Sequence, residues 1–205
     1  MELVPLSKKS VDIKSNELKF CFKIENVIVT FEVGHEIKPE LIHAKLKQTE
    51  YSPKLCCGCV YKMINPQVTF RINYSGKIFA IGNKTEKQAF LASRKMVRIL
   101  QLISYPSKLL NYKIVNVVAT ANVKFPVNLS LLAENNPQST NYEPEIFSGA
   151  FFKSFKPKLS MIIFVNGKIV VMGAKSFQQA YDSVEFIEGY LQKYKKSKFQ
   201  HLELQ

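Results

Sequence analysis

The chain has 205 residues, of which 46% are hydrophobic and 22% charged, proportions that suit a soluble protein folded around its own core. Its 29 Lys and Arg against 16 Asp and Glu give a formal net charge of +13, which favours a polyanionic partner: nucleic acid, an acidic membrane surface or an acidic protein. No apolar run approaches the length of a membrane span and the N-terminus lacks a signal-peptide pattern, so we expect an intracellular protein that does not enter a membrane.

The first half of the chain begins with a long predicted strand over residues 20–33, which are rich in β-branched and aromatic residues. A short helix follows, and Pro39 suits its first position. Three short antiparallel strands come next, with Ser75-Gly76 as a tight hairpin turn. Their expected positions are 56–64, 67–74 and 77–81.

A long helix, expected over residues 85–104, closes this half. Thr85 followed three residues later by Gln88 forms a capping box, which predicts where the helix begins. Apolar residues then recur at helical spacing, so one side of the helix should pack on the sheet. These residues are Ala89, Ala92, Met96, Ile99 and Ile103.

The second half of the chain repeats this order of elements. A shift of 91 residues aligns 51–84 with 142–175 with eleven identities in 34 positions, which indicates two copies of one ancestral unit. The predicted strands of the second unit lie at 110–123, 147–155, 158–165 and 168–172, with a turn at Asn166-Gly167. Its predicted helices begin at Pro126 and at the capping box of Ser176 and Gln179, and the second has Ala180, Val184, Ile187 and Leu191 on its apolar side.

The two repeats predict an α+β fold with one curved antiparallel sheet and helices on a single face. Strand alternation in the second unit makes both faces of that sheet apolar. Ser160, Ile162, Phe164, Val170 and Met172 share one face, and Met161, Ile163, Val165, Ile169 and Val171 share the other. The helices account for one face. The second face must meet a ligand or partner, or else pair with a second copy of the sheet.

No catalytic or metal-binding pattern stands out. Cys56-Cys57-Gly58-Cys59 has a Cys-x-x-Cys spacing, but no second pair follows, and His35, His43 and His201 are scattered. The sequence shows no Gly-rich phosphate loop and no Ser/His/Asp or paired-carboxylate pattern. We therefore expect a protein that is not an enzyme and needs no cofactor or metal.

Several phrases resemble the conserved core of the TATA-box-binding protein family. "VNVVATANVKFPVNL", "NYEPEIF", "FKPK" and "IIFVNGKIVVMGAK" resemble its second half, and "EYSPK", "SGKI" and "LASRK" its first. The resemblance implies a saddle of two pseudo-symmetric repeats, 20–109 and 110–196, between tails 1–19 and 197–205. Its ten-stranded concave sheet would lie on the DNA minor groove and its convex helices would meet transcription factors. The implied function is that of a nuclear general transcription initiation factor that binds and bends A/T-rich promoter DNA.

The resemblance also implies roles for individual residues on the concave face. Asn26 and Asn116 match the asparagines that hydrogen-bond base edges, and Ile28 and Val118 match the apolar contacts beside them. Phe147 matches one of the two phenylalanines that wedge into a base step. The other matched minor-groove positions of the second repeat are the wedge Phe164 and the groove-lining Ile162 and Val170. Each residue taken singly also fits an ordinary core position.

The first repeat departs from the family pattern. Cys56 and Asn73 stand at its wedge positions, and Arg71 replaces an apolar groove residue. Phe79 and Ile81 replace smaller groove residues, Met172 replaces a threonine of the second repeat, and Phe79 is a candidate displaced wedge. The alternative function is therefore that of a divergent paralogue, mainly a protein-interaction platform with weak or relaxed DNA binding.

Basic and acidic side chains mark further contacts implied by the resemblance. The expected phosphate contacts are Lys62, Lys77, Lys84, Lys153, Lys168 and Lys175. Along the helix 85–104, Lys87, Arg94, Lys95 and Arg98 resemble the basic helix that meets acidic partners or additional DNA, although a solvated face would look the same. Glu143 and Glu145 match the acidic loop that docks transcription factor IIB. The implied partners are promoter DNA, proteins like transcription factors IIB and IIA, and the RNA polymerase machinery.

Overall fold

A computed structural model of the chain describes residues 20–52, 58–155 and 158–196. The strands are β1 (Cys21–Glu32), β2 (Thr49–Tyr51), β3 (Gly58–Met63), β4 (Val68–Asn73), β5 (Lys77–Asn83), β6 (Leu110–Asn122), β7 (Thr140–Asn141), β8 (Gly149–Phe155), β9 (Lys158–Phe164) and β10 (Lys168–Ala174). The helices are α1 (Pro39–Lys45), α2 (Glu86–Leu102), α3 (Leu129–Asn135) and α4 (Phe177–Leu191), and a 3-10 turn, η1 (Gln192–Tyr194), follows α4.

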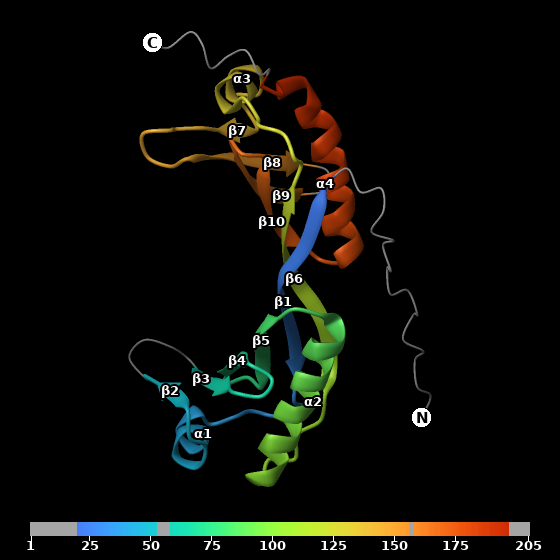
Figure 1. The fold of residues 1–205 in the computed structure, drawn as a ribbon. Coiled ribbons are helices and arrows are strands. Elements are labelled where there is room, and N and C mark those ends of the chain that lie inside the picture. Colours follow the sequence, from blue (N-terminus) through green and yellow to red (C-terminus); the bar gives the residue numbers. More distant parts are fainter. Residues whose placement is uncertain (1–19, 53–57, 156–157, 197–205) are drawn as a thin grey trace.

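All ten strands form one antiparallel sheet in the order β2-β3-β4-β5-β1-β6-β10-β9-β8-β7. Five consecutive strands of the sheet come from each repeat, and β1 and β6 join the halves at the centre. Figure 1 shows the sheet curving, with α2 and α4 both on its convex side and α1 and α3 at its two ends. The predicted α+β saddle with two repeats is therefore confirmed.

The central pair of strands is long and irregular. β1 and β6 run antiparallel from Cys21, opposite Asn122, to Glu32, opposite Leu110, with three register shifts between them. Such bulges bend a strand and increase its twist, which helps the sheet to curve. They also move single residues, such as Glu25, out of the regular alternation.

The capping boxes confirm the predicted starts of α2 and α4. The side-chain oxygen of Thr85 accepts from the backbone N–H of Gln88 at 3.1 Å, and that of Ser176 accepts from Gln179 at 3.1 Å. These bonds satisfy backbone donors that an isolated helix start leaves unpaired.

The core lies between the sheet and its helices, as one buried cluster in each repeat. Ala89, Ala92 and Met96 of α2 are fully buried in the first cluster. Ala180, Val184, Ile187 and Leu191 of α4 are fully buried in the second. One predicted position is wrong: Val165, expected on the buried face, lies just beyond the end of β9 and is exposed, because the regular alternation of the strand ends there.

The start of the second short helix also differs from the prediction. Pro39 does occupy the first turn of α1, but α3 begins at Leu129, three residues after Pro126. Asn128 is the N-cap, and its side-chain oxygen accepts from the N–H of Leu131 at 3.2 Å. Pro126 instead offers its carbonyl to the N–H of Lys196 at 3.0 Å, so a contact with the chain beyond η1 fixes this segment outside the helix.

Candidate nucleic-acid interface

The concave face is the side of the sheet opposite α2 and α4, and its centre lies where β1 pairs with β6. There Asn26 is the Cα partner of Val118, and Ile28 is the partner of Asn116. Val27 and Val117, which face the helices, are fully buried, whereas these four residues remain partly accessible. The structure thus brings two amides and two apolar side chains together in a pseudo-twofold arrangement.

Each of these asparagines is anchored by the same hydrogen bond. The backbone N–H of Gly82 donates to Oδ1 of Asn26 at 2.9 Å, and that of Gly173 donates to Oδ1 of Asn116 at 3.0 Å. Both glycines have a left-handed φ, +102° and +96°, which residues with a side chain rarely adopt. Within the described part of the chain, the Nδ2 group of each asparagine has no hydrogen-bond partner, so its two N–H donors are available to a ligand.

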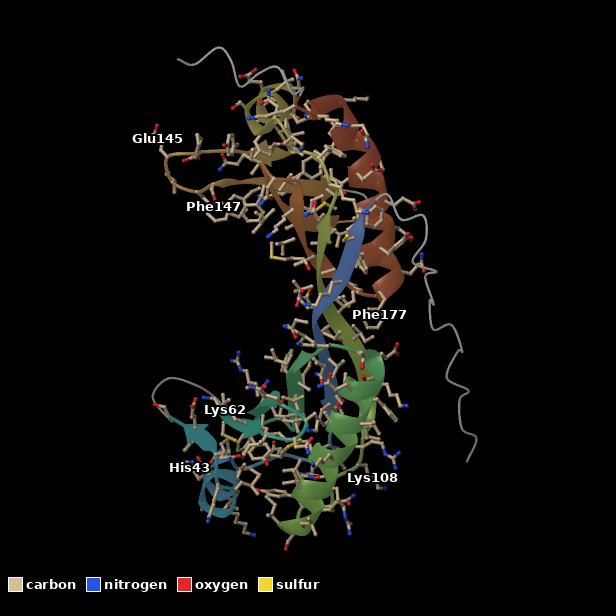
Figure 2. The ribbon with its side chains drawn as sticks, in the orientation of Figure 1. His43, Lys62, Lys108, Glu145, Phe147 and Phe177 are labelled. Carbon is tan, nitrogen blue, oxygen red and sulfur yellow. The ribbon has the colours of Figure 1, made fainter. Side chains whose placement is uncertain are left out.

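Three phenylalanines form a cluster on the concave face of the second repeat. The ring centroid of Phe147 lies 5.2 Å from that of Phe151, in a stacked arrangement, and 6.0 Å from that of Phe164, in an edge-on arrangement. Phe147 is 37% exposed and Phe151 is 45% exposed. Figure 2 shows Phe147 on the loop that projects from the upper half of the sheet.

A glycine makes room for this cluster. Gly149 is the Cα partner of Phe164, and a Cβ atom at Gly149 would lie 2.8 Å from Cε1 of Phe147 and 3.1 Å from Cε1 of Phe164. A turn before it sets the direction of Phe147, whose N–H donates to the carbonyl of Glu143 at 2.9 Å. The rings are therefore positioned by the backbone as well as by each other.

The first repeat has no such cluster among the residues that the structure describes. Asn73 is the partner of Gly58, as Phe164 is of Gly149. The exposed Arg71 lies between Val60 and Phe79, and Nζ of Lys77 lies 5.8 Å from the ring centroid of Phe79. Cys56, the other expected wedge position, lies outside the described residues.

A carboxylate also lies near the centre of this face. Glu25, at the first register shift of β1, pairs with Nζ of Lys23 at 2.8 Å and accepts from the hydroxyl of Thr120 at 3.1 Å. The hydrogen bond from Lys23 is the main reason that the pKa of Glu25 is lowered. The lysine offsets a negative charge that would otherwise face any polyanion bound there.

Comparison with known proteins identifies the fold and its family. A family model described as "Transcription factor TFIID (or TATA-binding protein, TBP)" matches residues 21–103 and 111–194, which together span both repeats. The chain belongs to the TATA-binding protein family.

Members of the TATA-binding protein family resemble the chain over most of its length. A TBP-related factor of Drosophila melanogaster is 37% identical over 175 residues, covering 85% of this chain and 78% of that protein. A TATA-box-binding protein of Dictyostelium discoideum is 35% identical over 188 residues, 92% of each chain. A solved structure of Methanococcus jannaschii TBP superposes with a TM-score of 0.76 at 31% identity, over 84% of this chain and 98% of that one. The protein is a TBP-like transcription factor. Nothing in these comparisons indicates an enzyme.

The lysines expected to contact phosphates lie within β3 and β8, at the starts of β5 and β10, and just after those two strands. Lys62 and Lys153 are pseudo-equivalent, but Lys62 is ion-paired with Glu50 of β2. Lys84 and Lys175 each come directly before a helix N-cap. All six are exposed except Lys77, which is half-buried: Lys62, Lys77, Lys84, Lys153, Lys168 and Lys175.

The partner-binding residues expected from the resemblance to the TATA-binding protein also lie on the surface. Glu143 and Glu145 are exposed, and Figure 2 shows Glu145 at the end of the loop that carries Phe147. On α2, Lys87, Arg94, Lys95 and Arg98 are exposed. Lys95 donates to the backbone carbonyl of Asn65, and Arg98 donates to the side chain of Gln101 at 3.3 Å.

Sequence reasoning missed several residues of the concave face. Phe151 joins Phe147 and Phe164, and Val60 occupies the equivalent position in the first repeat. Both follow by strand alternation from neighbouring residues that were identified. Thr120 follows in the same way from Val118, whereas Lys23 and Glu25 left no such signal, because a bulge at Glu25 interrupts the alternation of β1. Among the described residues, no group of His, Cys, Asp and Glu is placed to hold a metal ion, and no helix is both long and apolar enough to cross a membrane.

Proposed function

We propose that the chain binds the minor groove of A/T-rich promoter DNA with its concave face, bends it, and recruits the transcription machinery in the nucleus. The paired arrangement of Asn26 and Asn116 at the centre of an uncovered sheet carries this proposal. Family membership supports it, because relatives of the chain are named for binding the TATA box.

The asparagines favour A/T base pairs for a chemical reason. In the minor groove, A·T and T·A pairs present only acceptors, whereas a G·C pair adds the amino donor of guanine. The Nδ2 groups of Asn26 and Asn116 are donors, since the glycine N–H groups already occupy the amide oxygens. Two donors facing acceptors make hydrogen bonds, but donors facing a guanine amino group do not.

The phenylalanine cluster favours bending at one end of the site. An aromatic ring that enters a base step unstacks it and kinks the duplex toward the major groove. Phe147 and Phe164 are partly exposed and preset by Phe151 and Gly149, so little ordering is needed when they insert. The first repeat offers Asn73 at the matching position.

The alternative proposal is a protein-interaction platform with weak or relaxed DNA binding. It is favoured by one observation: Arg71 and Asn73 replace two apolar groove positions in the first repeat. A charged and a polar side chain in half of the groove reduce the apolar area that can meet DNA.

Fluorescence anisotropy with A/T-rich and G/C-rich duplexes at one fixed salt concentration separates the two proposals. We expect a preference for A/T of at least about tenfold, largely lost when Asn26→Ala and Asn116→Ala are combined. Gln178→Ala, which removes a carboxamide from α4 on the convex side, is the matched control. It should leave the affinities for both duplexes unchanged. Equal affinity for both duplexes, unchanged in the double variant, would favour the interaction platform.

A further inference from the structure

The outer sides of α2 and α4 carry opposite charge although the two helices are pseudo-equivalent. Residues 86–102 contain four basic side chains and one acidic one, whereas residues 177–191 contain three acidic side chains and no basic one. The N-caps Thr85 and Ser176 set the correspondence, which places Glu185 where the first repeat has Arg94. An acidic helix is unexpected by chance in a chain of net charge +13.

The same correspondence places Phe186 where the first repeat has Lys95. Lys95 lies over the first repeat and donates to the carbonyl of Asn65, in the turn between β3 and β4. Phe186 has no hydrogen-bond donor in its side chain and so cannot make the contact that Lys95 makes. It is 65% exposed, although α4 otherwise buries its apolar side chains wholly or in part.

Two hollows adjoin at Phe186, on the side of α4 that faces β8 and α3. One, of about 380 Å³, lies between the first turns of α4 and the strands, where Asp182, Ser154 and Met161 line it. The other, of about 540 Å³, lies toward the α3–β7 loop, where Tyr190, Phe152 and Pro137 line it. Phe186 and Ser154 line both, so the two hollows form one groove with an aromatic side chain at its middle.

The groove therefore combines apolar lining side chains with negative charge on α4. Asp182 and Glu185 are exposed on α4, while Glu188 is buried and accepts from Gln192. Lys153 is the basic side chain of the second hollow, and it lies at the end nearer the concave face. Asp182 in the lining and Glu185 beside Phe186 make the α4 side of the groove negative, which is complementary to a basic segment that carries an apolar or aromatic anchor.

We infer that this groove, lined by Asp182, Phe186 and Tyr190 and flanked by Glu185 on α4, docks a Lys- or Arg-rich segment of a partner protein, with an apolar anchor beside Phe186. The ring of Phe186 offers both an apolar surface and a face for a cation. DNA is excluded as the occupant because the exposed carboxylates repel phosphates. The groove lies on the convex side, and Lys153 is the one residue of its lining that also belongs to the expected phosphate contacts.

The test uses the full chain and a phage-displayed library of short random peptides. Peptides are selected on the wild-type protein, with counter-selection on the Phe186→Ala variant, and the enriched sequences are synthesised with a fluorescent label. We expect the enriched peptides to combine Lys or Arg with an apolar or aromatic residue. Enrichment of acidic peptides, or of none, would overturn the inference.

Affinities of the labelled peptides then assign the binding to the groove. Phe186→Ala should weaken binding at least about tenfold, as hot-spot aromatic residues do. Asp182→Lys combined with Glu185→Lys should weaken it further and reduce its dependence on salt. Leu91→Ala is the matched control, because Leu91 is a 51% exposed apolar residue on the outer side of α2 and should leave the affinity unchanged.

Two further measurements keep the result interpretable. Every variant should unfold at the wild-type temperature and bind the A/T-rich duplex as the wild type does, so that a loss of peptide binding is local. Sedimentation of the wild type and of Phe186→Ala detects self-association. A dimer that is lost in the variant would assign the groove to a second copy of this chain and overturn the inference.

Discussion

Asn73 and Gly58 are Cα partners across β3 and β4, so an amide side chain lies where the second repeat has a phenyl ring beside a glycine. The two halves of the concave face therefore differ at the position where we propose that a side chain opens a base step. A phenyl ring recovers part of the unstacking cost by stacking, whereas an amide there leaves hydrogen-bonding groups unmet.

We expect DNA bending to be lopsided. Phe164→Ala should remove most of the bend, and Asn73→Phe should increase it, because the substitution supplies a second ring beside Gly58. Bend angles follow from fluorescence energy transfer on an end-labelled duplex. A symmetrical bend that survives Phe164→Ala would contradict the assignment of the wedge, and a bend lost in Phe79→Ala would make Phe79 the wedge of the first repeat.

Gly149→Ala should disturb the phenylalanine cluster. The new Cβ would lie 2.8 Å from Cε1 of Phe147 and 2.9 Å from Cγ2 of Ile162, so the rings must shift, at a cost of about 1–3 kcal/mol in the free energy of unfolding. Gly189→Ala is the matched control. It has no atom within 4 Å of its new Cβ and lies inside α4, so it should stabilise the protein by about 0.5–1 kcal/mol. Urea unfolding measures both changes, and equal effects would refute the steric argument.

The salt dependence of DNA binding should reveal which lysines meet phosphates. About 4–7 phosphate contacts predict a slope of log K against log salt near −4 to −6, and Lys153→Ala with Lys168→Ala should flatten it by about two. Lys62→Ala should flatten it less than Lys153→Ala, because Glu50 already pairs with Lys62. A wild-type slope near zero would instead assign the positive charge to a protein partner.

Tyr112 should make stability depend on alkaline pH. Burial, with a smaller contribution from Glu86, raises the pKa of Tyr112 to about 12. The folded pKa of Tyr112 lies above the unfolded value near 10. The contribution of Tyr112 to the free energy of unfolding is therefore complete below pH 10 and is lost as the pH rises through 12. Because the side chain is only partly buried, this contribution is limited to roughly 1–2 kcal/mol.

Tyr112→Phe separates the hydroxyl from the ring. In the described part of the chain the hydroxyl is buried without a hydrogen-bond partner, while the ring packs edge-on against Phe90 at 5.4 Å. The substitution should therefore stabilise the protein by about 1 kcal/mol at neutral pH, and the loss of stability between pH 10 and 12 should shrink. A destabilised variant would mean that the hydroxyl has a partner in solution.

The sequence by itself determined the repeat, the starts of α2 and α4, and the order of the elements apart from the edge strands β2 and β7, which it did not predict. These features rest on local chemistry: the side-chain oxygens of Thr85 and Ser176 cap their own helices three residues on, and alternation assigns Ile162 and Met161 to opposite faces. The family motifs then predicted one face for Asn26, Asn116, Phe147 and Phe164. The structure pairs the strands of the two asparagines at the centre of the sheet and joins the two phenylalanines in a separate ring cluster.

The tertiary structure decided which residues meet across the register shifts. Alternation from Asn116 puts Tyr112 on the concave face, but a register shift of β6 turns it toward Phe90 of α2. Glu25 meets Thr120, 95 residues away, for the same reason, and Gly82 meets Asn26 across 56 residues. Side chains of a strand alternate between the two faces of the sheet, so one extra residue reverses the face of every side chain beyond it. The packing of the neighbouring strands and helices, rather than the local sequence, sets the position of that extra residue.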